Sequence, residues 1–240
     1  MSNTTALRFD GLQKSYSRQS VLRGFDLDVA AGEFFGLVGV NGAGKTTCIK
    51  VLLNFSHLDG GAIHLFDTSH TDTRARERVA YLPERFLPPY YLTGNEFFRY
   101  MGRLHGRIPA EQEINDMLAA LDLDQSALNK PVRDYSKGMA QKLGLAACFL
   151  SGKDLLILDE PMSGLDPKAR LLVKRYLSGL KDQGRTVFLS THLLADVDDL
   201  CDRMGVLHEG QLRFTGSPKE CLETFAAETL EQAYLHCISA

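Results

Sequence analysis

A glycine-rich segment at residues 39–46 constrains the fold of this 240-residue chain more than any other feature. It reads Gly-Val-Asn-Gly-Ala-Gly-Lys-Thr and matches the pattern G-x-x-x-x-G-K-[S/T]. Residues 33–40 form an almost continuous apolar run, typical of a strand covered on both faces, and residues 46–54 have helical periodicity. A strand, a glycine-rich turn and a helix in this order predict a phosphate-binding loop. This context favours that interpretation over a glycine-rich turn with an incidental lysine.

The chemistry of phosphate binding explains each residue type in this loop. The glycines let backbone N–H groups turn toward phosphate oxygens, and the positive end of the following helix faces the same point. We expect Lys45 to reach the β- and γ-phosphates and Thr46 to bind magnesium. The segment therefore predicts a site for ATP or GTP together with Mg²⁺.

Two carboxylates follow a second apolar run, Leu-Leu-Ile-Leu-Asp-Glu, at residues 155–160. Acids at the end of a buried strand suit a cation or a reaction. We expect Asp159 to bind magnesium, directly or through water, and Glu160 to polarise the water that attacks the γ-phosphate. Alternatively, the two acids could be exposed residues that cap the next turn. The presence of the phosphate loop in the same chain favours the first interpretation.

The composition narrows the class of protein. The net charge is −3, which gives no electrostatic footprint for nucleic acid, so we expect no nucleic-acid partner. No apolar run approaches the roughly 18 residues of a membrane-spanning helix, and the first ten residues lack the pattern of a signal peptide. The cysteines form no C-x-x-C pair, and a reducing cytoplasm suits them best. They are Cys48, Cys148, Cys201, Cys221 and Cys237.

The remaining periodicity predicts an α/β fold whose sheet is interrupted by helices. Alternating polarity at residues 7–16 and 25–29 is typical of strands with one solvated face. Residues 78–82 and 185–191 are expected to form further buried strands. Four segments between these two strands have helical patterns, three before the carboxylates and one after them. These helical segments are residues 95–104, 109–121, 136–150 and 167–182.

Two further segments distinguish this chain from other phosphate-loop proteins. Residues 135–141 read Tyr-Ser-Lys-Gly-Met-Ala-Gln and place a serine and a glycine at a helix start. Such a start offers a hydroxyl, free N–H groups and a favourable dipole to a second anion. The other segment is Ser-Gly-Leu-Asp at residues 163–166, followed by Ser-Thr-His at residues 190–192, at the end of the next predicted strand.

With these motifs in this order, nearly the whole chain resembles the ATP-binding subunit of ABC transporters. The resemblance identifies residues 39–47 with the Walker A loop, Asp159 and Glu160 with Walker B, and residues 163–166 with the D-loop. It makes Glu160, His192 and Lys45 the catalytic candidates, with His192 as the switch histidine that holds the γ-phosphate. The expected nucleotide-binding residues are Tyr16, Gly39, Asn41, Gly42, Ala43, Gly44, Lys45, Thr46, Thr47, Ser136 and Gly138.

Two parts of this site carry special expectations. Tyr16 is similar to the aromatic residue that stacks on adenine, although a lone tyrosine is more often a strand-face aromatic. Ser136 and Gly138 resemble the signature motif, which in the family meets the γ-phosphate held by the opposite subunit.

Glu84 departs from the family pattern, because most members have a glutamine after this strand. A glutamate can still accept a hydrogen bond from a magnesium-bound water, so we expect Glu84 to join Thr46 and Asp159 at the metal. The same residue is expected to relay the state of the membrane partner. Together with the Tyr-Ser-Lys-Gly-Met variant, the segment around Glu84 resembles the bacterial exporter-type branch.

The resemblance implies one ATP-binding cassette over residues 1–240 with a phosphate-loop NTPase, or RecA-like, sheet core, an antiparallel β part and an inserted α-helical subdomain. Residues 1–82 and 153–216 are expected to form the sheet core. Residues 83–152 would be the helical subdomain that carries the signature motif, and residues 217–240 a C-terminal helical tail.

The same resemblance implies a mechanism and partners. Two cassettes close head to tail around two ATP molecules, and hydrolysis opens them again. We expect a second ATP-binding subunit, in a homodimer or a heterodimer, and separate membrane-spanning subunits. The chain would then lie peripherally on the cytoplasmic face of the cell membrane. The membrane partner selects the cargo in this family, so the sequence predicts no cargo.

Two other functions remain as alternatives. An ABC-type ATPase that acts in DNA repair or translation would usually carry a long coiled coil, a second cassette or a basic surface. A plain phosphate-loop kinase or GTPase would lack the segment at residues 135–141 and the terminal histidine. A GTPase would also need a base-reading N-K-x-D motif, which the chain does not contain.

Overall fold

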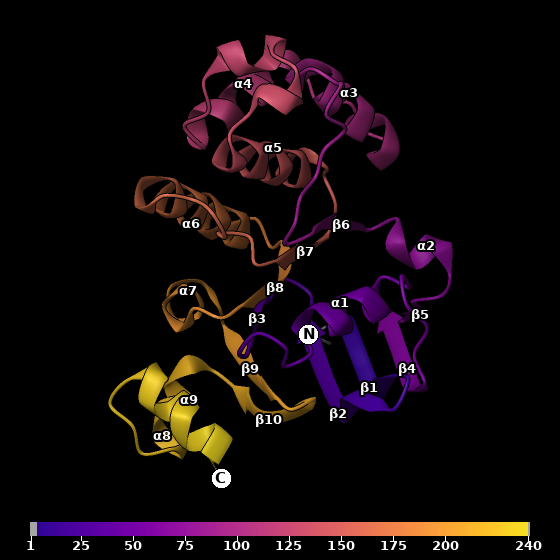
Figure 1. Cartoon of the computed structure of the whole chain (residues 1–240), viewed down its shortest axis with the longest axis vertical. Coiled ribbons are helices and arrows are strands. Elements are labelled where there is room, and N and C mark those ends of the chain that lie inside the picture. Colours follow the sequence, from indigo (N-terminus) through magenta and orange to yellow (C-terminus); the bar gives the residue numbers. More distant parts are fainter. Residues whose placement is uncertain (1–3, 240) are drawn as a thin grey trace.

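A six-stranded sheet forms the centre of the computed structural model, which describes residues 4–239 (Figure 1). Residues 1–3 and 240, the outermost parts of the predicted core and tail, lie outside the described residues. The strand order is β10-β9-β3-β8-β7-β6. The strands are β3 (Phe34–Val38), β6 (Val79–Leu82), β7 (Leu155–Asp159), β8 (Thr186–Thr191), β9 (Arg203–His208) and β10 (Gln211–Gly216).

Five of these strands run parallel, so their carboxyl ends meet at one edge of the sheet. The register pairs Val38 with Thr191 and Asp159 with Ser190. Strand β10 instead returns antiparallel to β9, in a hairpin that turns at Glu209 and Gly210. The parallel register therefore brings the ends of the phosphate-loop strand and the carboxylate strand close to that of β8.

Burial of both sheet faces explains the apolar runs. Side chains alternate along a strand, and in β3 Phe34 and Val38 face one hydrophobic core while Phe35 and Leu37 face a second one. Each strand thus needs apolar residues at consecutive positions.

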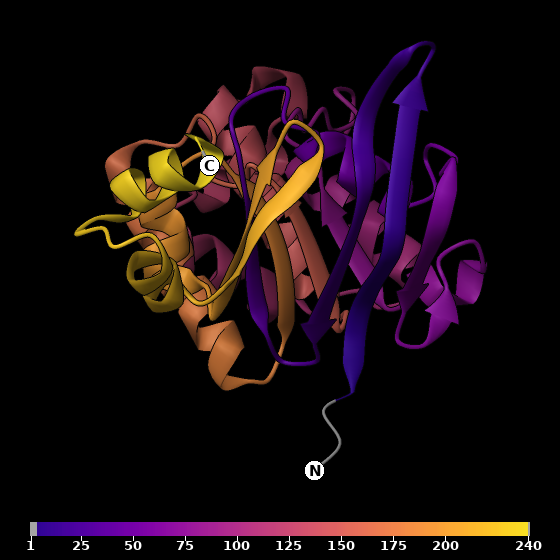
Figure 2. The same cartoon turned by 90° about the horizontal axis from the view of Figure 1, so that it is seen from below.

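The second core lies under a four-stranded antiparallel sheet, in the order β2-β1-β4-β5. Helix α1 (Lys45–Leu52) contributes its buried residues to this core, between the two sheets (Figures 1 and 2). Aromatic contacts join the sheets, because Phe188 of β8 lies 6.3 Å from Phe9 between ring centroids. The strands are β1 (Thr5–Tyr16), β2 (Gln19–Ala30), β4 (Gly60–Leu65) and β5 (Thr68–Ser69).

Helices form the part of the molecule at the top of Figure 1. Thr93 and Glu96 make a capping box at the start of α3, and Gly106 ends that helix in the left-handed conformation. Helix α5 returns to the sheet, where Gln141 Nε2 donates a buried 2.9 Å hydrogen bond to Pro161 O. The elements are α3 (Gly94–His105), α4 (Glu111–Ala120), the 3₁₀ turns η1 (Gln125–Asn129) and η2 (Val132–Asp134), and α5 (Lys137–Leu150).

The later helices pack against the same hydrophobic core as the helical part, on the face of the sheet opposite to α1. They are α6 (Pro167–Asp182), α7 (Leu194–Leu200), α8 (Pro218–Thr224) and α9 (Leu230–Ser239), besides the single turn α2 (Thr73–Arg76). The sequence analysis did not predict α2 or α7, because four and seven residues are too few for a clear helical period. No helix within residues 4–239 is both long and apolar enough to cross a membrane.

All five cysteines lie within the described residues as free, buried thiols. Burial raises the pKa of every one of them, to about 12 for Cys148 and about 11 for Cys221. These thiols therefore serve as small apolar side chains in the two cores.

The aromatic cluster between the sheets predicts a large cost for truncation. Phe188 stacks on Phe35 at 5.8 Å and also touches Phe9, so Phe188→Ala leaves a cavity that neither sheet can fill alone. We expect it to lower the free energy of unfolding by about 3–5 kcal/mol in equilibrium urea denaturation. Leu171→Ala, at a 58% exposed position, is the control and should change it by less than about 0.5 kcal/mol. A loss below about 1 kcal/mol for Phe188→Ala would contradict this account of the core.

Candidate functional site

The candidate site lies where four neighbouring parallel strands end. Strand β3 leads into the phosphate loop, β6 into the segment with Glu84, β7 ends at Asp159, and β8 leads to His192. Crevices outside the carboxyl ends of parallel strands are the usual ligand sites of such sheets. The fold thus brings together motifs that are far apart in the sequence.

Close backbone contacts require glycine in the phosphate loop. A Cβ at Gly39 would lie 2.4 Å from Leu207 O. Gly44 has a φ of 113°, and a Cβ there would lie 2.9 Å from a side-chain carbon of Leu22. Helix α1 starts directly after Gly44 with no acidic residue in its first turn. Its positive end therefore remains available to an anion.

Lys45 is buried within this loop, with 6% of its surface exposed. Its Nζ donates hydrogen bonds to the backbone oxygens of Gly39, at 2.6 Å, and Val40, at 3.4 Å. The same Nζ lies 3.5 Å from Glu160 Oε1. A positive charge is thus held between the loop and a carboxylate, where it can meet a phosphate group.

Asp159 is 1% exposed at the end of β7. Its Oδ1 accepts a hydrogen bond from Ser190 Oγ, whereas its Oδ2 is buried and has no hydrogen-bond partner among the described residues. Burial raises the pKa of Asp159, the hydrogen bond from Ser190 and the nearby Thr46 hydroxyl lower it, and the charges of Glu84 and Glu160 raise it further. A cation bound here would satisfy the carboxylate oxygen that has no partner within residues 4–239 and would offset the repulsion between the neighbouring acids.

These groups fit magnesium. Asp159 Oδ2 and the Thr46 hydroxyl are hard oxygen donors side by side at the mouth of the loop. Within residues 4–239 no cluster of three or more His, Cys, Asp or Glu side chains could hold a metal by itself. This agrees with the habit of Mg²⁺, which takes one or two protein ligands and completes its shell with phosphate oxygens and water.

Glu160 has a strained backbone, with a φ of 48°. Its N–H donates to Ser190 O at 3.1 Å, which fixes the turn after β7. The carboxylate then lies between Lys45 and His192, with Oε2 at 2.9 Å from His192 Nδ1. Strain of this kind concentrates at functional sites. His192 is itself half-exposed, so one end of this row reaches the solvent.

Most of the predicted site residues line a single pocket of about 230 Å³ above the loop. Ala43 is buried beneath the loop, and Gly39 lies on the side of His192. The lining consists of Val21, Val40, Asn41, Gly42, Gly44, Lys45, Thr46, Thr47, Glu84 and Glu160.

Seven predicted residues are absent from this lining: Gly39, Ala43, Asp159 and His192, which lie in the loop or beside it, and Tyr16, Ser136 and Gly138. Tyr16 is 45% exposed, with its hydroxyl 3.3 Å from Ser56 Oγ, so the structure does not bring its ring to the loop. Ser136 and Gly138 begin α5, where Ser136 Oγ accepts a 3.2 Å hydrogen bond from the N–H of Met139. The adenine-stacking and signature roles of these three residues stay predictions.

The sequence analysis missed two contributors. It noted Ser190 only as part of a motif, but this serine bonds to Asp159 and contacts the backbone of Glu160. It also missed Tyr234 of α9, which lines a second pocket with Gly39 and His192. Neighbouring strand ends could have indicated Ser190, whereas no local pattern marks Tyr234.

A larger pocket, of about 640 Å³, lies between α3, α4 and η1 in the helical part. Asn95, Arg99 and Asn129 are among its lining residues, and none of the predicted site residues is. Size therefore does not identify the functional site here, whereas the phosphate loop and the carboxylates do.

The family model described as "ABC transporter" matches residues 22–163. An uncharacterised ABC transporter ATP-binding protein of Synechocystis sp. is 41% identical over 84% of this chain and 58% of its own length. A similar protein of Nostoc sp. is 41% identical over 84% and 61%. Nod factor export ATP-binding protein I of Ralstonia nicotianae is 36% identical over 92% and 70%. The chain thus spans about 60% of the length of the first two relatives.

Solved structures agree with these relatives. An ATP-binding subunit of an ABC transporter has a TM-score of 0.89 at 31% identity, covering 97% of this chain and 99% of its own. A dimeric ATP-binding cassette bound to ADP and phosphate has a TM-score of 0.80 at 18% identity, covering 88% and 98%, and is evidence of the fold alone. The predicted phosphate-loop α/β fold and the family resemblance are confirmed. Because the family model covers more than half of the chain and its motifs meet at one sheet edge, the chain belongs to the ABC transporter family.

Proposed function

We propose that this chain binds and hydrolyses ATP and thereby energises transport across a membrane through separate membrane-spanning subunits. The observation that carries the proposal is the row of Lys45, Glu160 and His192 beside the phosphate loop. Relatives named for Nod factor export in Ralstonia nicotianae and bacitracin transport in Enterococcus faecalis support transport, and favour export, over DNA repair or translation. The chain would act on the cytoplasmic face of the membrane.

Binding follows from the groups at the loop. Backbone N–H groups of the glycine-rich turn and the Lys45 ammonium would hold the phosphates of ATP. Thr46 and Asp159 would hold magnesium, which supplies charge neutralisation on the phosphate oxygens. Asp159 is suited to this because one of its oxygens has no other partner among the described residues.

Hydrolysis needs a positioned water, and Glu160 is the group that would orient it. Lys45 and His192 hold the two carboxylate oxygens from opposite sides, so the side chain has little freedom. Water attacks the γ-phosphorus, the bond to the ADP oxygen breaks, and ADP and phosphate leave. The half-exposed His192 would contact the γ-phosphate from the solvent side.

A second copy of the chain would complete the site. Ser136 is exposed at the start of α5, away from the phosphate loop of its own chain. Its hydroxyl and the first N–H groups of α5 form an anion-binding helix start. We therefore assign Ser136 and Gly138 to the nucleotide held by the opposite subunit of a homodimer.

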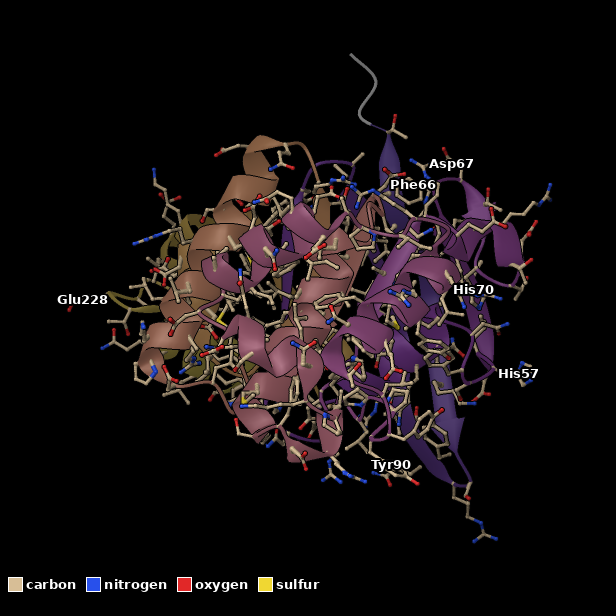
Figure 3. The ribbon with its side chains drawn as sticks, turned by 90° about the horizontal axis from the view of Figure 1, so that it is seen from above. His57, Phe66, Asp67, His70, Tyr90 and Glu228 are labelled. Atoms are coloured by element: carbon tan, nitrogen blue, oxygen red, sulfur yellow. The ribbon has the colours of Figure 1, made fainter. Side chains whose placement is uncertain are left out.

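The membrane partner would contact the segment after Glu84. Leu87 is 88% exposed, and Tyr90 and Tyr91 are each 67% exposed on the same loop. Tyr90 lies at the edge of the molecule in Figure 3. Exposed apolar side chains this close together mark an interaction surface. Since Glu84 also lines the nucleotide pocket, this loop would link the pocket to the partner.

Glu160→Gln tests the role in hydrolysis. The amide keeps the shape of the carboxylate but cannot accept a proton, so we expect ATP hydrolysis to fall on the order of 10²-fold or more. Binding of a fluorescent ATP analogue should persist, and a dimer should accumulate with ATP in size-exclusion chromatography. Lys45→Ala should instead lose binding. The exposed Glu223→Gln is the matched control, and normal phosphate release by Glu160→Gln would refute the assignment.

Ser136→Arg tests whether the start of α5 acts on a second copy. The arginine should abolish dimerisation and turnover yet leave nucleotide affinity of the monomer nearly unchanged. Because this change also removes a helix cap worth about 1 kcal/mol, Ser136→Asp is the matched variant. Aspartate retains the cap but repels phosphate, so it should fail in the same way. Loss of monomer binding in either variant would place this segment at its own site.

Glu84→Ala tests the link between the pocket and the membrane partner. The variant should retain ATP binding and some basal hydrolysis as an isolated subunit but lose most of the transport by the complex purified from membranes. Both activities are measured in one reconstituted preparation, with the exposed Glu223→Ala, outside this segment, as the control. Equal loss of both would make Glu84 an ordinary ligand of the active site, and loss of neither would make it a surface acid.

A further inference from the structure

The C-terminal helix α9 is fixed to the rest of the molecule along one face. Leu230, Ala233 and Cys237 are buried on this face and belong to the larger hydrophobic core. Their spacing of three and four residues is that of one helical stripe, and Tyr234 lies on the same stripe. The helix contacts α7, α8, β9 and β10, beside which it lies in Figure 1. Its position is therefore set by packing.

This packing places Tyr234 against the outer side of the phosphate loop. The ring closes a mostly apolar pocket of about 310 Å³ next to the nucleotide pocket. Tyr234 is the only lining residue of this pocket from the described part of the tail. The other lining residues come from the loop and from the segment after β8, and they are Val38, Gly39, Val40, Asn41, His192 and Leu194.

Tyr234 lies beside a part of the phosphate loop that is otherwise largely exposed to solvent. Val40 is 49% exposed and Asn41 is also exposed. On the inner side, Lys45 Nζ bonds to the backbone oxygens of Gly39 and Val40. On the outer side, Tyr234 lines a pocket together with the same stretch of the loop.

The Tyr234 hydroxyl is expected to contribute less than the ring to holding the phosphate loop. Its Oη is buried and has no well-formed hydrogen bond among the described residues. Burial raises the pKa of Tyr234, and the nearby backbone N–H of Val40 opposes this shift, so the hydroxyl lies beside Val40. The ring itself packs against the larger core, to which Val38 just before the loop also belongs.

We propose that Tyr234 is a positioning residue of the nucleotide site, whose ring couples the docking of helix α9 to the geometry of the phosphate loop and His192. The inference rests on the proposed function. It concerns a residue outside the family match, which ends at residue 163. Without the ring, the backbone at Val40 and Asn41 gains freedom that ATP binding must remove, and such ordering reduces affinity. His192 also loses a neighbour on one side.

Tyr234→Ala and Tyr234→Phe separate the ring from the hydroxyl. In Tyr234→Ala we expect the dissociation constant of a fluorescent ATP analogue and the KM for ATP to rise about 3- to 10-fold. The loss in kcat should be smaller, because Glu160 still contacts Lys45. Tyr234→Phe keeps the packing and should remain within about twofold of the wild type. Amide hydrogen exchange at residues 38–42 of nucleotide-free protein should be faster than in the wild type in Tyr234→Ala but not in Tyr234→Phe.

Two controls come from the same helix. Leu235→Ala, at a 57% exposed position, should leave binding and exchange unchanged. Leu230→Ala is the positive control, because it loosens the docking of α9 while the ring remains and should therefore speed loop exchange in the same direction as Tyr234→Ala. Each variant is also compared by thermal unfolding, so that a general loss of stability is recognised.

Three results would overturn the inference. They are wild-type binding and exchange in Tyr234→Ala, equal defects in Tyr234→Phe and Tyr234→Ala, and wild-type loop exchange in Leu230→Ala. Failure of the proposed function would look different, because the wild-type protein would then bind ATP without hydrolysing it. The binding and exchange measurements would still decide the role of Tyr234 in that case.

Discussion

Burial of both faces of the central sheet is the constraint on which this structure depends. Strands β3, β7 and β8 are buried at every position because helices cover one face of the sheet and α1 with the antiparallel sheet covers the other. Parallel pairing then aligns the strand ends, and a shift of one residue would exchange the side chains of the two cores. The polar groups of the site can therefore occupy only the positions just past the strands.

Electrostatics at this edge follows from that geometry. Asp159 and Glu160 are adjacent acids that are nearly inaccessible to water, which is costly unless positive charge is close. Lys45 supplies one such charge at 3.5 Å from Glu160, and the donor set at Asp159 and Thr46 suits a divalent cation. The arrangement that satisfies these acids is also the one proposed to bind a nucleotide with its metal, so folding and the proposed ligand binding make similar demands on the same residues.

The sequence predicted the parts of this molecule that are encoded locally. The phosphate loop, the carboxylates after β7 and the helical insertion each have a contiguous pattern of residue types, and all lie where the patterns indicate. Helix α7 was missed because seven residues hardly complete two turns. Tyr16 and Tyr234 show the other limit. A tyrosine carries no local signal for its neighbours, so tertiary packing alone decides that Tyr234 lines a pocket beside the loop and that Tyr16 does not line the loop pocket, and the adenine-stacking role of Tyr16 stays a prediction.

The buried cysteines can be used as probes of local opening of the structure. A thiol with a raised pKa and no solvent contact reacts slowly with alkylating reagents, so labelling requires that its surroundings open first. Cys48 lies in α1 directly behind the phosphate loop, Cys201 follows α7, and Cys237 lies in α9. Each one samples a different part of the two cores. The rate at which each thiol is modified would thus measure how often its surroundings open: α1 behind the phosphate loop for Cys48, the end of α7 for Cys201 and the C-terminal helix for Cys237.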